Sequence, residues 1–596
     1  MKIKNIFKIF VMSAVAVAGF SSCTDFLTIY PTDKTIGEEF WKTKDDVKGM
    51  VTGAYASMVS NGCQERAIIW GAFRSDELNK YSSYSSTALD NINAVNLLPT
   101  NGYNSWGDFY GVINRCNIVL NHAKDVMELD PEFTQGDYDE TRAQMLALRS
   151  LCYFYLVRTF RDIPYTTQSY EDDDQVMIIP QTTPDSVMQF CIRDLEEAER
   201  YIMKSGGYGV RNWRNVGYFT RDAVHALLAD IYLWRASMTH NQADYRKCID
   251  YVDMVIRSKD EYFKTVNTDR VSSLADEFHL ADRDQMYSTI FGEGNSHESI
   301  LEWQYDGTNI ANGGIRELYY EEGSKDSHRN TGVLEASQLF SSPDEHANDL
   351  QGTKVYASSN DYRFWQNVYG VSKTASEATG LQIRKFIATR DFVSGTGQST
   401  GNDPTNLNTG ESKSNSRAWE NFSQNWIVYR LTDLMLMKAE ALVQTAANDS
   451  DKVVLDQAFN LVQVVNKRSM AKTATDTLVA TNFASKEQME LLVLAERERE
   501  LCFEGKRWYD LVRYCYRHME GVNINRKMAD DTSWPALYAP MLRLVVRKYV
   551  NGGDAVSYKM KSEPYLYWPI QYSEELVNKL LKQNPVFIME KTSTKN

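Results

Sequence analysis

Apolar residues recur every three to four positions in eight segments of the chain, which is the spacing of one face of an α-helix. The segments are Thr141–Phe160, Pro184–Met203, Thr220–Ser237, Ala243–Arg257, Arg430–Thr445, Lys452–Met470, Ser485–Glu504 and Lys506–Tyr516. A further helix is expected to begin near Trp106. Ser485 and Gln488 have capping-box spacing, and Gly505 separates the last two segments where a helix terminus favours glycine. The pattern therefore predicts a mainly helical protein.

Successive helices form about four pairs of roughly 34 to 40 residues, a period typical of tetratricopeptide-like repeats. Alanines alternate with leucines and tyrosines in these segments. Alanine lets neighbouring helices approach closely, and aromatic rings fill the remaining gaps. We expect a tetratricopeptide-like scaffold over about 106–257 and 430–516.

Two irregular regions interrupt this scaffold. The larger, about 258–429, is rich in Gly, Asn, Ser and Asp, and contains strand-like runs at Ser299–Tyr305 and Leu381–Ala388. The smaller, Lys80–Asn104, precedes the helix near Trp106. Long loops on a rigid frame are where binding residues concentrate, so the larger region is interpreted as a ligand-binding insertion. Residues from about 517 to 596 form a closing segment.

The N-terminus has the pattern of a signal peptide. Three lysines precede an uncharged apolar stretch from Ile9 to Phe20, too short to span a bilayer, and Ser21, Ser22 and Cys23 follow. Either ordinary cleavage occurs nearby, or Cys23 is acylated and becomes the first residue of a lipoprotein. The cysteine directly after small residues favours the second interpretation. Residues 1–22 are then the signal peptide, 23–40 a lipidated tether and 41–596 a single domain.

Charge and composition exclude several classes of function. The formal charge is −14, and removal of residues 1–22 takes away three lysines and no acid, which leaves about −17. A chain this acidic does not suit nucleic-acid phosphates. No apolar run after residue 22 is long enough to cross a bilayer. Seven further cysteines are widely spaced without a C-x-x-C motif, so buried free thiols are expected and zinc is not.

The motifs of common enzymes and cofactor sites are also missing from the sequence, which has no P-loop, no G-x-S-x-G and no dinucleotide fingerprint. No cofactor and no catalytic residue is predicted. Glu496, Glu500 and Glu504 lie on one face of a predicted helix near several arginines, a pattern typical of structural ion pairs. The acidic run Glu171–Asp174 lacks the spacing of a calcium loop and is interpreted as a solvated turn.

Five blocks of the sequence resemble the RagB/SusD family of nutrient-binding outer-membrane lipoproteins. The blocks are Ala147–Pro164, Arg430–Leu442, Asn466–Arg468, Glu496–Arg513 and Tyr567–Pro585. The fourth, ERERELCFEGKRWYDLVR, is the most specific. Two residues depart from the family pattern: Arg161 stands where glycine is usual, and Gln571 where proline is usual. Together with the Cys-Thr-Asp-Phe-Leu start, the resemblance covers the whole mature chain.

The resemblance implies a non-catalytic lipoprotein on the outer-membrane surface that binds oligosaccharide or polysaccharide. It also implies a partner, a SusC-type TonB-dependent transporter, over which the protein sits as a lid. Its ligand contacts are expected from the loop before the Trp106 helix and from the central insertion. The predicted glycan-binding residues are Tyr81, Tyr84, Asn101, Tyr103, Tyr320 and Trp365, and each also has an interpretation as an ordinary surface or core residue. Trp106 itself is interpreted as core, because apolar residues accompany it at helical spacing.

Three alternatives remain open. The same architecture can carry peptides instead of glycans. A helical glycosidase would need two carboxylates facing each other across a cleft, and the sequence shows no such pair. A purely structural partner subunit would have no ligand of its own.

Overall fold

The computed structural model describes residues 40–172, 175–266, 278–283, 285–320, 332–369, 371, 381–389, 421–471 and 474–588. Ten long helices form its frame: α3 (Lys44–Met58), α6 (Gly107–Leu129), α7 (Gln135–Phe160), α8 (Pro184–Tyr201), α10 (Arg221–Thr239), α11 (Gln242–Val266), α14 (Leu431–Thr445), α15 (Lys452–Ser469), α16 (Lys486–Leu501) and α17 (Arg507–Arg517). Each of the eight segments predicted from periodicity is a helix, within a few residues at most ends. The largest differences are that α7 begins earlier and α11 ends later than predicted.

Shorter elements connect and cover this frame. The helices are α4 (Asn61–Ile68), α5 (Thr87–Asn93), α9 (Arg214–Gly217), α12 (Gly313–Tyr319), α13 (Tyr362–Gln366), α18 (Ala539–Val546), α19 (Gly553–Lys559) and α20 (Tyr572–Val577), with π-turns η1 (Ile69–Phe73) and η3 (Ser288–Glu293). The 3₁₀ turns are η2 (Gly102–Asn104), η4 (Gln338–Phe340), η7 (Ala480–Phe483), η8 (Met528–Asp530), η9 (Glu563–Leu566) and η10 (Pro585–Phe587). Six strands form three antiparallel pairs: β1 (Leu78–Lys80) with β5 (Leu334–Ala336), β2 (Ile163–Pro164) with β3 (Gln181–Thr182), and β4 (Ser299–Trp303) with β6 (Trp426–Arg430).

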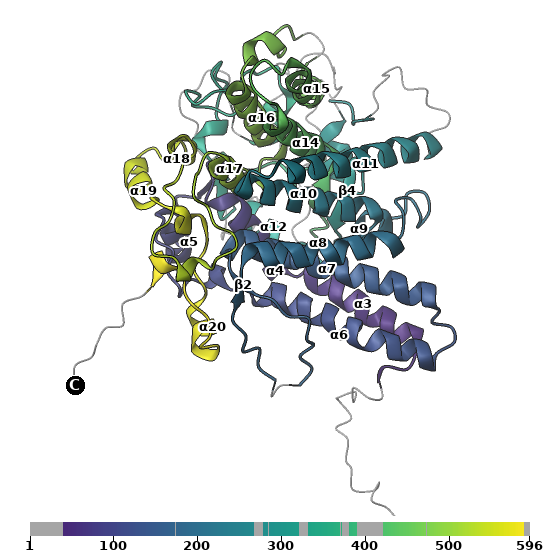
Figure 1. Cartoon of the computed structure of the whole chain (residues 1–596). Helices are drawn as coiled ribbons and strands as arrows, with labels where there is room; N and C mark the ends of the chain where they lie inside the picture. Colours follow the sequence, from purple (N-terminus) through teal and green to yellow (C-terminus); the bar gives the residue numbers. More distant parts are fainter. Residues whose placement is uncertain are drawn as a thin grey trace, which may run out of the picture.

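The long helices pack in sequence order as a continuous array (Figure 1). α3 packs on α6, α6 on α7, α7 on α8, α8 on α10, α10 on α11, α11 on α14, and α14 on both α15 and α16. Such nearest-neighbour packing is the arrangement of a helical-repeat scaffold. The predicted fold class is confirmed. The last predicted pair is an exception in its packing, because α16 lies mainly against α14, whereas α17 lies mainly against α10 and η1.

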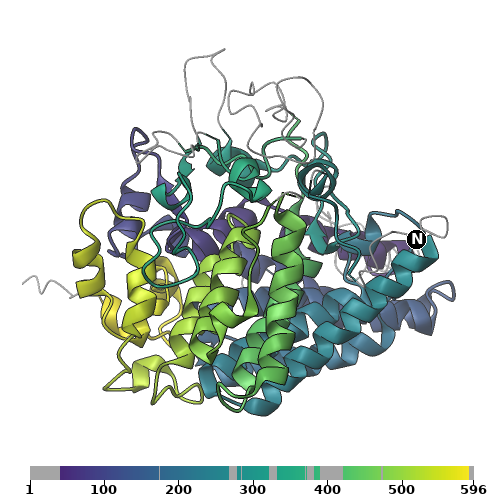
Figure 2. The same cartoon turned by 90° about the horizontal axis from the view of Figure 1, so that it is seen from above.

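The remaining segments cover this array. Seen from above, the described part of the central insertion (teal) gathers along one side of the helices (Figure 2). The C-terminal segment lies beside α5, where the Tyr549 hydroxyl donates to the Asn93 carbonyl over 2.7 Å. Parts of the insertion are also buried against the helices, including Arg363 and Lys385.

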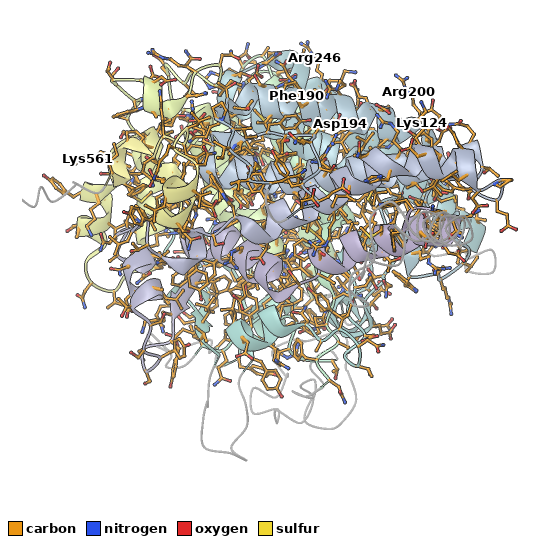
Figure 3. The ribbon with its side chains drawn as sticks, turned by 90° about the horizontal axis from the view of Figure 1, so that it is seen from below. Lys124, Phe190, Asp194, Arg200, Arg246 and Lys561 are labelled. Atoms are coloured by element: carbon orange, nitrogen blue, oxygen red, sulfur yellow. The ribbon has the colours of Figure 1, made fainter. Side chains whose placement is uncertain are left out.

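Polar contacts also join the array. Asp194 of α8, which is labelled in Figure 3, accepts a hydrogen bond of 2.5 Å from Arg149 of α7, and both side chains are buried. Arg149 also donates to Asn117 of α6, so one guanidinium links three successive helices. A buried charge that is paired in this way fixes the register of neighbouring helices, because shifting one helix would leave the charge without a partner.

Three sequence features are resolved by the fold. The run Leu381–Ala388 is not a strand; it contains only isolated bridge positions, one of which is Ile383, paired with Val368. Trp106 is core, with 2% of its surface exposed. The seven cysteines after Cys23 are all free and buried, as predicted.

The backbone conformation and the contacts of Arg161 explain why an arginine can stand where the family pattern has glycine. It ends α7 with a φ of 66°, a left-handed conformation in which glycine is favoured. Its guanidinium is buried and donates to Glu563 and to the carbonyls of Asn523 and Arg526. These bonds tie the end of α7 to the C-terminal segment, and they offset the conformational cost of a side chain at this position.

The charged run on α16 builds three buried ion-pair clusters. The first contains five bases and five acids: Arg363, Lys385, Arg430, Arg468 and Arg499 with Glu298, Asp361, Glu496, Glu500 and Glu504. The second joins Arg497, Lys506, Arg513, Arg517 and His518 to Asp433, Glu440, Glu490 and Asp510. The third joins Arg507 and Arg547 to Asp76 and Glu498. Since acids and bases balance within each cluster, apart from the partly exposed His518, the run holds the scaffold together, as predicted.

Candidate functional site

The strand pair β1–β5 brings the two predicted ligand-binding regions together. Lys80 pairs with Leu334, and the Tyr81 amide continues the pairing by donating to the Val333 carbonyl over 3.0 Å. Residues about 250 positions apart in the sequence therefore lie side by side on paired strands. This pairing places the Lys80–Asn104 loop beside the central insertion.

A tight turn presents Tyr84 on this surface. The Tyr84 amide donates to the Tyr81 carbonyl over 3.0 Å, and the Lys80 ammonium donates to the Tyr84 carbonyl. Lys80 also pairs with Asp90 of α5 at 3.3 Å. Tyr81 and Tyr84 are both half-buried, so part of each ring remains accessible.

Asn101 positions Tyr103. Its Oδ1 accepts from the Tyr103 amide, and its Nδ2 donates to the Ala88 carbonyl, each over 3.0 Å. The Asn101 side chain is buried, with 7% exposed. The Tyr103 carbonyl accepts from the indole of Trp70 over 2.8 Å, which fixes the turn against the core. Asn101 remains a predicted site residue, and this geometry gives it a role in orienting its neighbour.

Two helices that the sequence analysis missed complete the surface. α4 supplies Glu65 and Arg66, and α12 packs against α4 and supplies Glu317. The close approach is possible because residue 314 is glycine: a Cβ there would lie 2.8 Å from the Gln64 side-chain oxygen. Arg66 donates to the Ser105 carbonyl over 2.7 Å and pairs with Asp108 at 3.3 Å. No local pattern in the sequence indicates that Glu65 and Tyr103 are neighbours.

The electrostatics of this surface are unusual for exposed loops. Burial raises the pKa of the Glu65 carboxyl, the nearby Arg66 counteracts it, and the carboxylate of Glu317 raises it further. Burial, with the charge of Glu65 and the neighbouring Tyr84 adding to it, raises the pKa of Tyr103 to about 12. Tyr84, Tyr103, Glu65, Arg66 and Glu317 are called the loop cluster from here on.

The loop cluster combines half-buried tyrosine rings with polar groups. Tyrosine offers an apolar face together with a hydroxyl that donates and accepts hydrogen bonds. The Glu65 carboxylate has no ion pair within the described part of the chain, so its oxygens are not committed to a basic partner. Such a surface suits a ligand that has both C–H faces and hydroxyl groups.

Tyr320 and Trp365 occupy different surroundings. Tyr320 follows α12 directly, is half-buried, and packs edge-on against Phe422 with ring centroids 5.7 Å apart. Trp365 has only 4% of its surface exposed, packs on Phe364 and donates through Nε1 to the Ser359 carbonyl over 2.8 Å. Trp365 presents no open ring face in this structure, and its neighbour Arg363 binds α16. The geometry therefore supports Tyr320 better than Trp365.

Other predicted features are placed as follows. Glu171 accepts from His122 over 2.9 Å on the surface, whereas Asp173 and Asp174 lie outside the described residues. Cys23 lies outside them as well. Within the described ranges, no three His, Cys, Asp or Glu side chains gather as a metal site. Of the helices in those ranges, none combines the length and the apolar character needed to span a membrane.

The fold and this surface together define a helical-repeat binding scaffold with aromatic, charged loops. Two family models match the chain: one described as the SusD family over residues 302–587, and one described as starch-binding associating with outer membrane over residues 25–233. The chain belongs to the SusD family. Proteins of this family are in general non-catalytic, carbohydrate-binding proteins of nutrient uptake.

Individual relatives can be aligned with this chain over nearly its whole length. SusD-like protein P38 of Formosa agariphila is 23% identical over 576 residues, which cover 91% of this chain and 97% of that protein. A SusD superfamily protein from Bacteroides thetaiotaomicron has a similar structure, with a TM-score of 0.60 at 19% identity, covering 92% of this chain and 99% of its own. NanU of B. fragilis has a TM-score of 0.59 at 17% identity, covering 93% and 99%. At these identities the structural likeness establishes the fold.

Proposed function

We propose that this chain captures oligosaccharide or polysaccharide at the outer-membrane surface and passes it to a SusC-type TonB-dependent transporter. The observation that supports the proposal is the loop cluster on a SusD-family scaffold, where Glu65 and Tyr84 lie close enough to Tyr103 to raise its pKa. Tyrosine faces contribute on the order of 1 kcal/mol each when they stack on a ligand ring. Useful affinity therefore requires several such contacts, and Tyr81 and Tyr320 are the further candidates.

The anchor and the partner complete this proposal. Acylation of Cys23 would hold the protein on the membrane, with residues 23–40 as a tether, because two or three acyl chains anchor stably where one does so only marginally. A ligand that contacts both proteins favours the closed lid by the contacts it gains there. The closed fraction of the transporter complex should therefore rise with ligand. An unchanged fraction would contradict the lid mechanism.

The proposal excludes catalysis as the main activity. The three regularly spaced carboxylates Glu496, Glu500 and Glu504 are buried in ion pairs with arginine and lysine. A glycosidase needs a carboxyl held ready for proton transfer in an open cleft. In contrast, partner charges lower the pKa of each of these three groups despite burial.

Native affinity electrophoresis of the Cys23→Ala protein tests the proposal. Gels containing starch, levan, xylan, mannan, pectins or host glycans are compared with a gel without polysaccharide. We expect retardation by one polymer, loss of that retardation in Tyr84→Ala/Tyr103→Ala, and no loss in Tyr558→Ala. Tyr558 is the matched control because it is an exposed tyrosine on α19. Retardation that survives the double substitution would contradict the assignment of the loop cluster.

Peptide capture is the alternative outcome. If no polysaccharide retards the protein while peptides from a protein digest are retained and then lost in the double variant, the cargo is peptide. A peptide groove would depend more on hydrogen bonds to backbone groups.

A further inference from the structure

A second aromatic surface lies between α3, α7, α9 and β4. Two adjoining cavities of about 420 and 140 Å³ share Thr52 and Tyr218 in their walls. The residues that define this surface, called the α3 groove, are Thr52, Tyr55, Tyr208, Trp213, Tyr218 and Trp303. None of them belongs to the loop cluster.

An exposed tryptophan forms the rim of the groove. Trp213 is 45% exposed, although large aromatic side chains are usually much more buried. Its ring stacks on Tyr218 with centroids 5.7 Å apart and planes 28° apart. Tyr218 in turn meets Tyr55 edge-on at 4.5 Å. The groove thus has an aromatic wall whose outermost ring faces solvent.

Hydrogen bonds hold the floor of the groove rigid. The Tyr208 hydroxyl donates to Glu140 over 3.0 Å, and the Phe219 amide donates to the Tyr55 hydroxyl over 3.1 Å. Gln144 links the two tyrosines, because it donates to the Tyr208 hydroxyl over 3.3 Å and accepts from the Tyr55 hydroxyl. A ligand therefore meets a surface that is already ordered, which reduces the entropic cost of binding.

The rim is equally fixed. Gly217 lies under Trp213 so closely that a Cβ there would be 2.7 Å from the indole ring. On the opposite lip, Asp306 accepts from the amides of Thr308, Asn309 and Ile310 at 2.7 to 3.0 Å. This turn presents Ile310, which lines the cavity and is 38% exposed.

The smaller cavity is apolar. Met58, Val59, Leu148, Leu151 and Leu301 line it together with the rings. Its volume of about 140 Å³ is close to the roughly 150 Å³ of an engineered apolar cavity that stays dry and binds benzene. A group of the size of one aromatic ring therefore fits this end of the groove.

The larger cavity is more polar than the smaller one, although most of its wall is still apolar. Lys48, Asp137, Glu140 and Arg214 line it, and the Arg214 guanidinium lies 5.4 Å from the centroid of the Trp213 ring. Both signs of charge are present, which suits a neutral ligand with several hydroxyl groups better than an ion. The two ends together select a molecule with one apolar ring and one polyhydroxylated part.

We infer that the α3 groove is a second binding site, for a sugar that carries an aromatic substituent. The aromatic group occupies the apolar cavity, and the sugar lies against Trp213 and the larger cavity. The choice of a sugar rests on the proposed function, whereas the aromatic end rests on the volume and lining of the cavity. Because the two sites share no residue, each can be removed without the other.

Calorimetric titration with 4-nitrophenyl glycosides of glucose, galactose, mannose and xylose tests this inference, with the methyl glycosides as controls. We expect at least one nitrophenyl glycoside to bind about tenfold or more tightly than its methyl counterpart. Trp213→Ala removes the wall, and Ala56→Phe fills the apolar end from an exposed position on α3. Each should reduce the affinity to that of the methyl glycoside.

Two control variants separate this site from the loop cluster. Ala555→Phe places the same side chain at an exposed alanine of α19 and should change nothing. Tyr84→Ala/Tyr103→Ala should leave nitrophenyl glycoside binding intact even if it abolishes retardation by polysaccharide. If the wild type binds nitrophenyl glycosides but no polysaccharide, the proposed function is refuted and the inference about the α3 groove is not.

Several results would overturn the inference. One is equal affinity for nitrophenyl and methyl glycosides, and another is unchanged binding in Ala56→Phe. If free 4-nitrophenol binds as tightly as the glycosides, the sugar part of the ligand contributes nothing to binding. Tighter binding of N-acetylphenylalanine amide would make the groove a peptide site.

Discussion

The ion-pair clusters around α16 and the loop cluster both contain carboxylates beside arginines. The pKa shifts of Glu500 and Glu65, one from each region, have opposite directions. In the core, Glu500 is surrounded by Arg363, Arg430 and Arg468, and these partners hold the pKa of its carboxyl well below the usual range despite burial. At the surface, burial and the neighbouring Glu317 raise the pKa of Glu65, which has Arg66 beside it. The carboxylates of the first cluster are therefore fully compensated, whereas compensation is incomplete at the predicted binding surface.

The difference has a physical reason. A buried charge that loses its partner costs several kcal/mol, so the scaffold keeps every carboxylate of the first cluster paired. A binding surface must keep polar groups available for the ligand, and it tolerates their cost because it stays partly hydrated. Perturbed pKa values mark both kinds of place, and the direction of the shift differs between Glu500 and Glu65.

The largest effect is expected from Arg430→Met. Arg430 donates to Glu504 and to the carboxylate and carbonyl of Glu500, so its loss leaves two buried carboxylates short of a partner. The free energy of unfolding should fall by about 3 to 5 kcal/mol, measured by urea denaturation. Arg543→Met, at an exposed arginine of α18, is the control and should change it by less than about 0.5 kcal/mol. Equal effects of the two substitutions would show that the clusters do not stabilise the fold.

The second largest effect is expected from low pH, which should lower the free energy of unfolding. The pKa values of Glu496, Glu500 and Glu504 are lowered in the folded state, so the unfolded chain binds protons first as the pH falls. The stability they provide is complete above the ordinary glutamate pKa of about 4.5 and is lost below it. Urea midpoints measured from pH 7 to pH 3 should therefore stay high until about pH 5 and then drop. A midpoint that is flat down to pH 3 is incompatible with the account.

A smaller effect is expected from Asn101→Ala. It removes the bonds to the Ala88 carbonyl and the Tyr103 amide, and should cost about 1 kcal/mol of stability. Ligand affinity should fall a few-fold because Tyr103 loses its orientation. Asn101→Asp keeps the acceptor for the Tyr103 amide and should retain most of the affinity. If both substitutions abolish binding while stability is unchanged, Asn101 contacts the ligand directly instead.

The smallest effect on stability is expected from Glu65→Gln. The folded-state pKa of Glu65 is raised, so its charge is unfavourable above that pKa and absent below it. At pH 7 the substitution should therefore be neutral or slightly stabilising, by less than about 1 kcal/mol after allowance for hydration. Below pH 4 the difference from the wild type should vanish. A large destabilisation at pH 7 would place Glu65 with the scaffold charges.

The sequence predicts the helical scaffold much better than the loop cluster. The helices of the scaffold follow from a 3.6-residue period that each segment carries by itself, and the capping box at Ser485 and Gln488 is present in the structure. Arg161 stands where glycine is usual in the family, and its φ of 66° accounts for that preference. Helix α3 was missed, as were α4 and α12, which are eight and seven residues long and give little periodic pattern.

The loop cluster depends on contacts that are distant along the chain. The pairing of Lys80 with Leu334 has no local sequence pattern, and neither has the approach of Glu65 to Tyr103. Tyr84 and Tyr103 were chosen because the family resemblance indicated their loop, and their role in binding stays a prediction. Trp365 could not be distinguished from a core tryptophan, since burial is a property of the folded chain. The domain boundaries and the lipidation of Cys23 stay predictions.

The most direct test of the central claim is a calorimetric titration of the polysaccharide that retards the protein, or of an oligosaccharide cut from it, into the wild type and Tyr84→Ala/Tyr103→Ala. Urea denaturation of both proteins accompanies it. The account predicts that affinity falls at least about tenfold, roughly 1.4 kcal/mol, while the free energy of unfolding changes by less than about 1 kcal/mol. Unchanged affinity in a folded double variant would contradict it, because the loop cluster would then not be the binding surface.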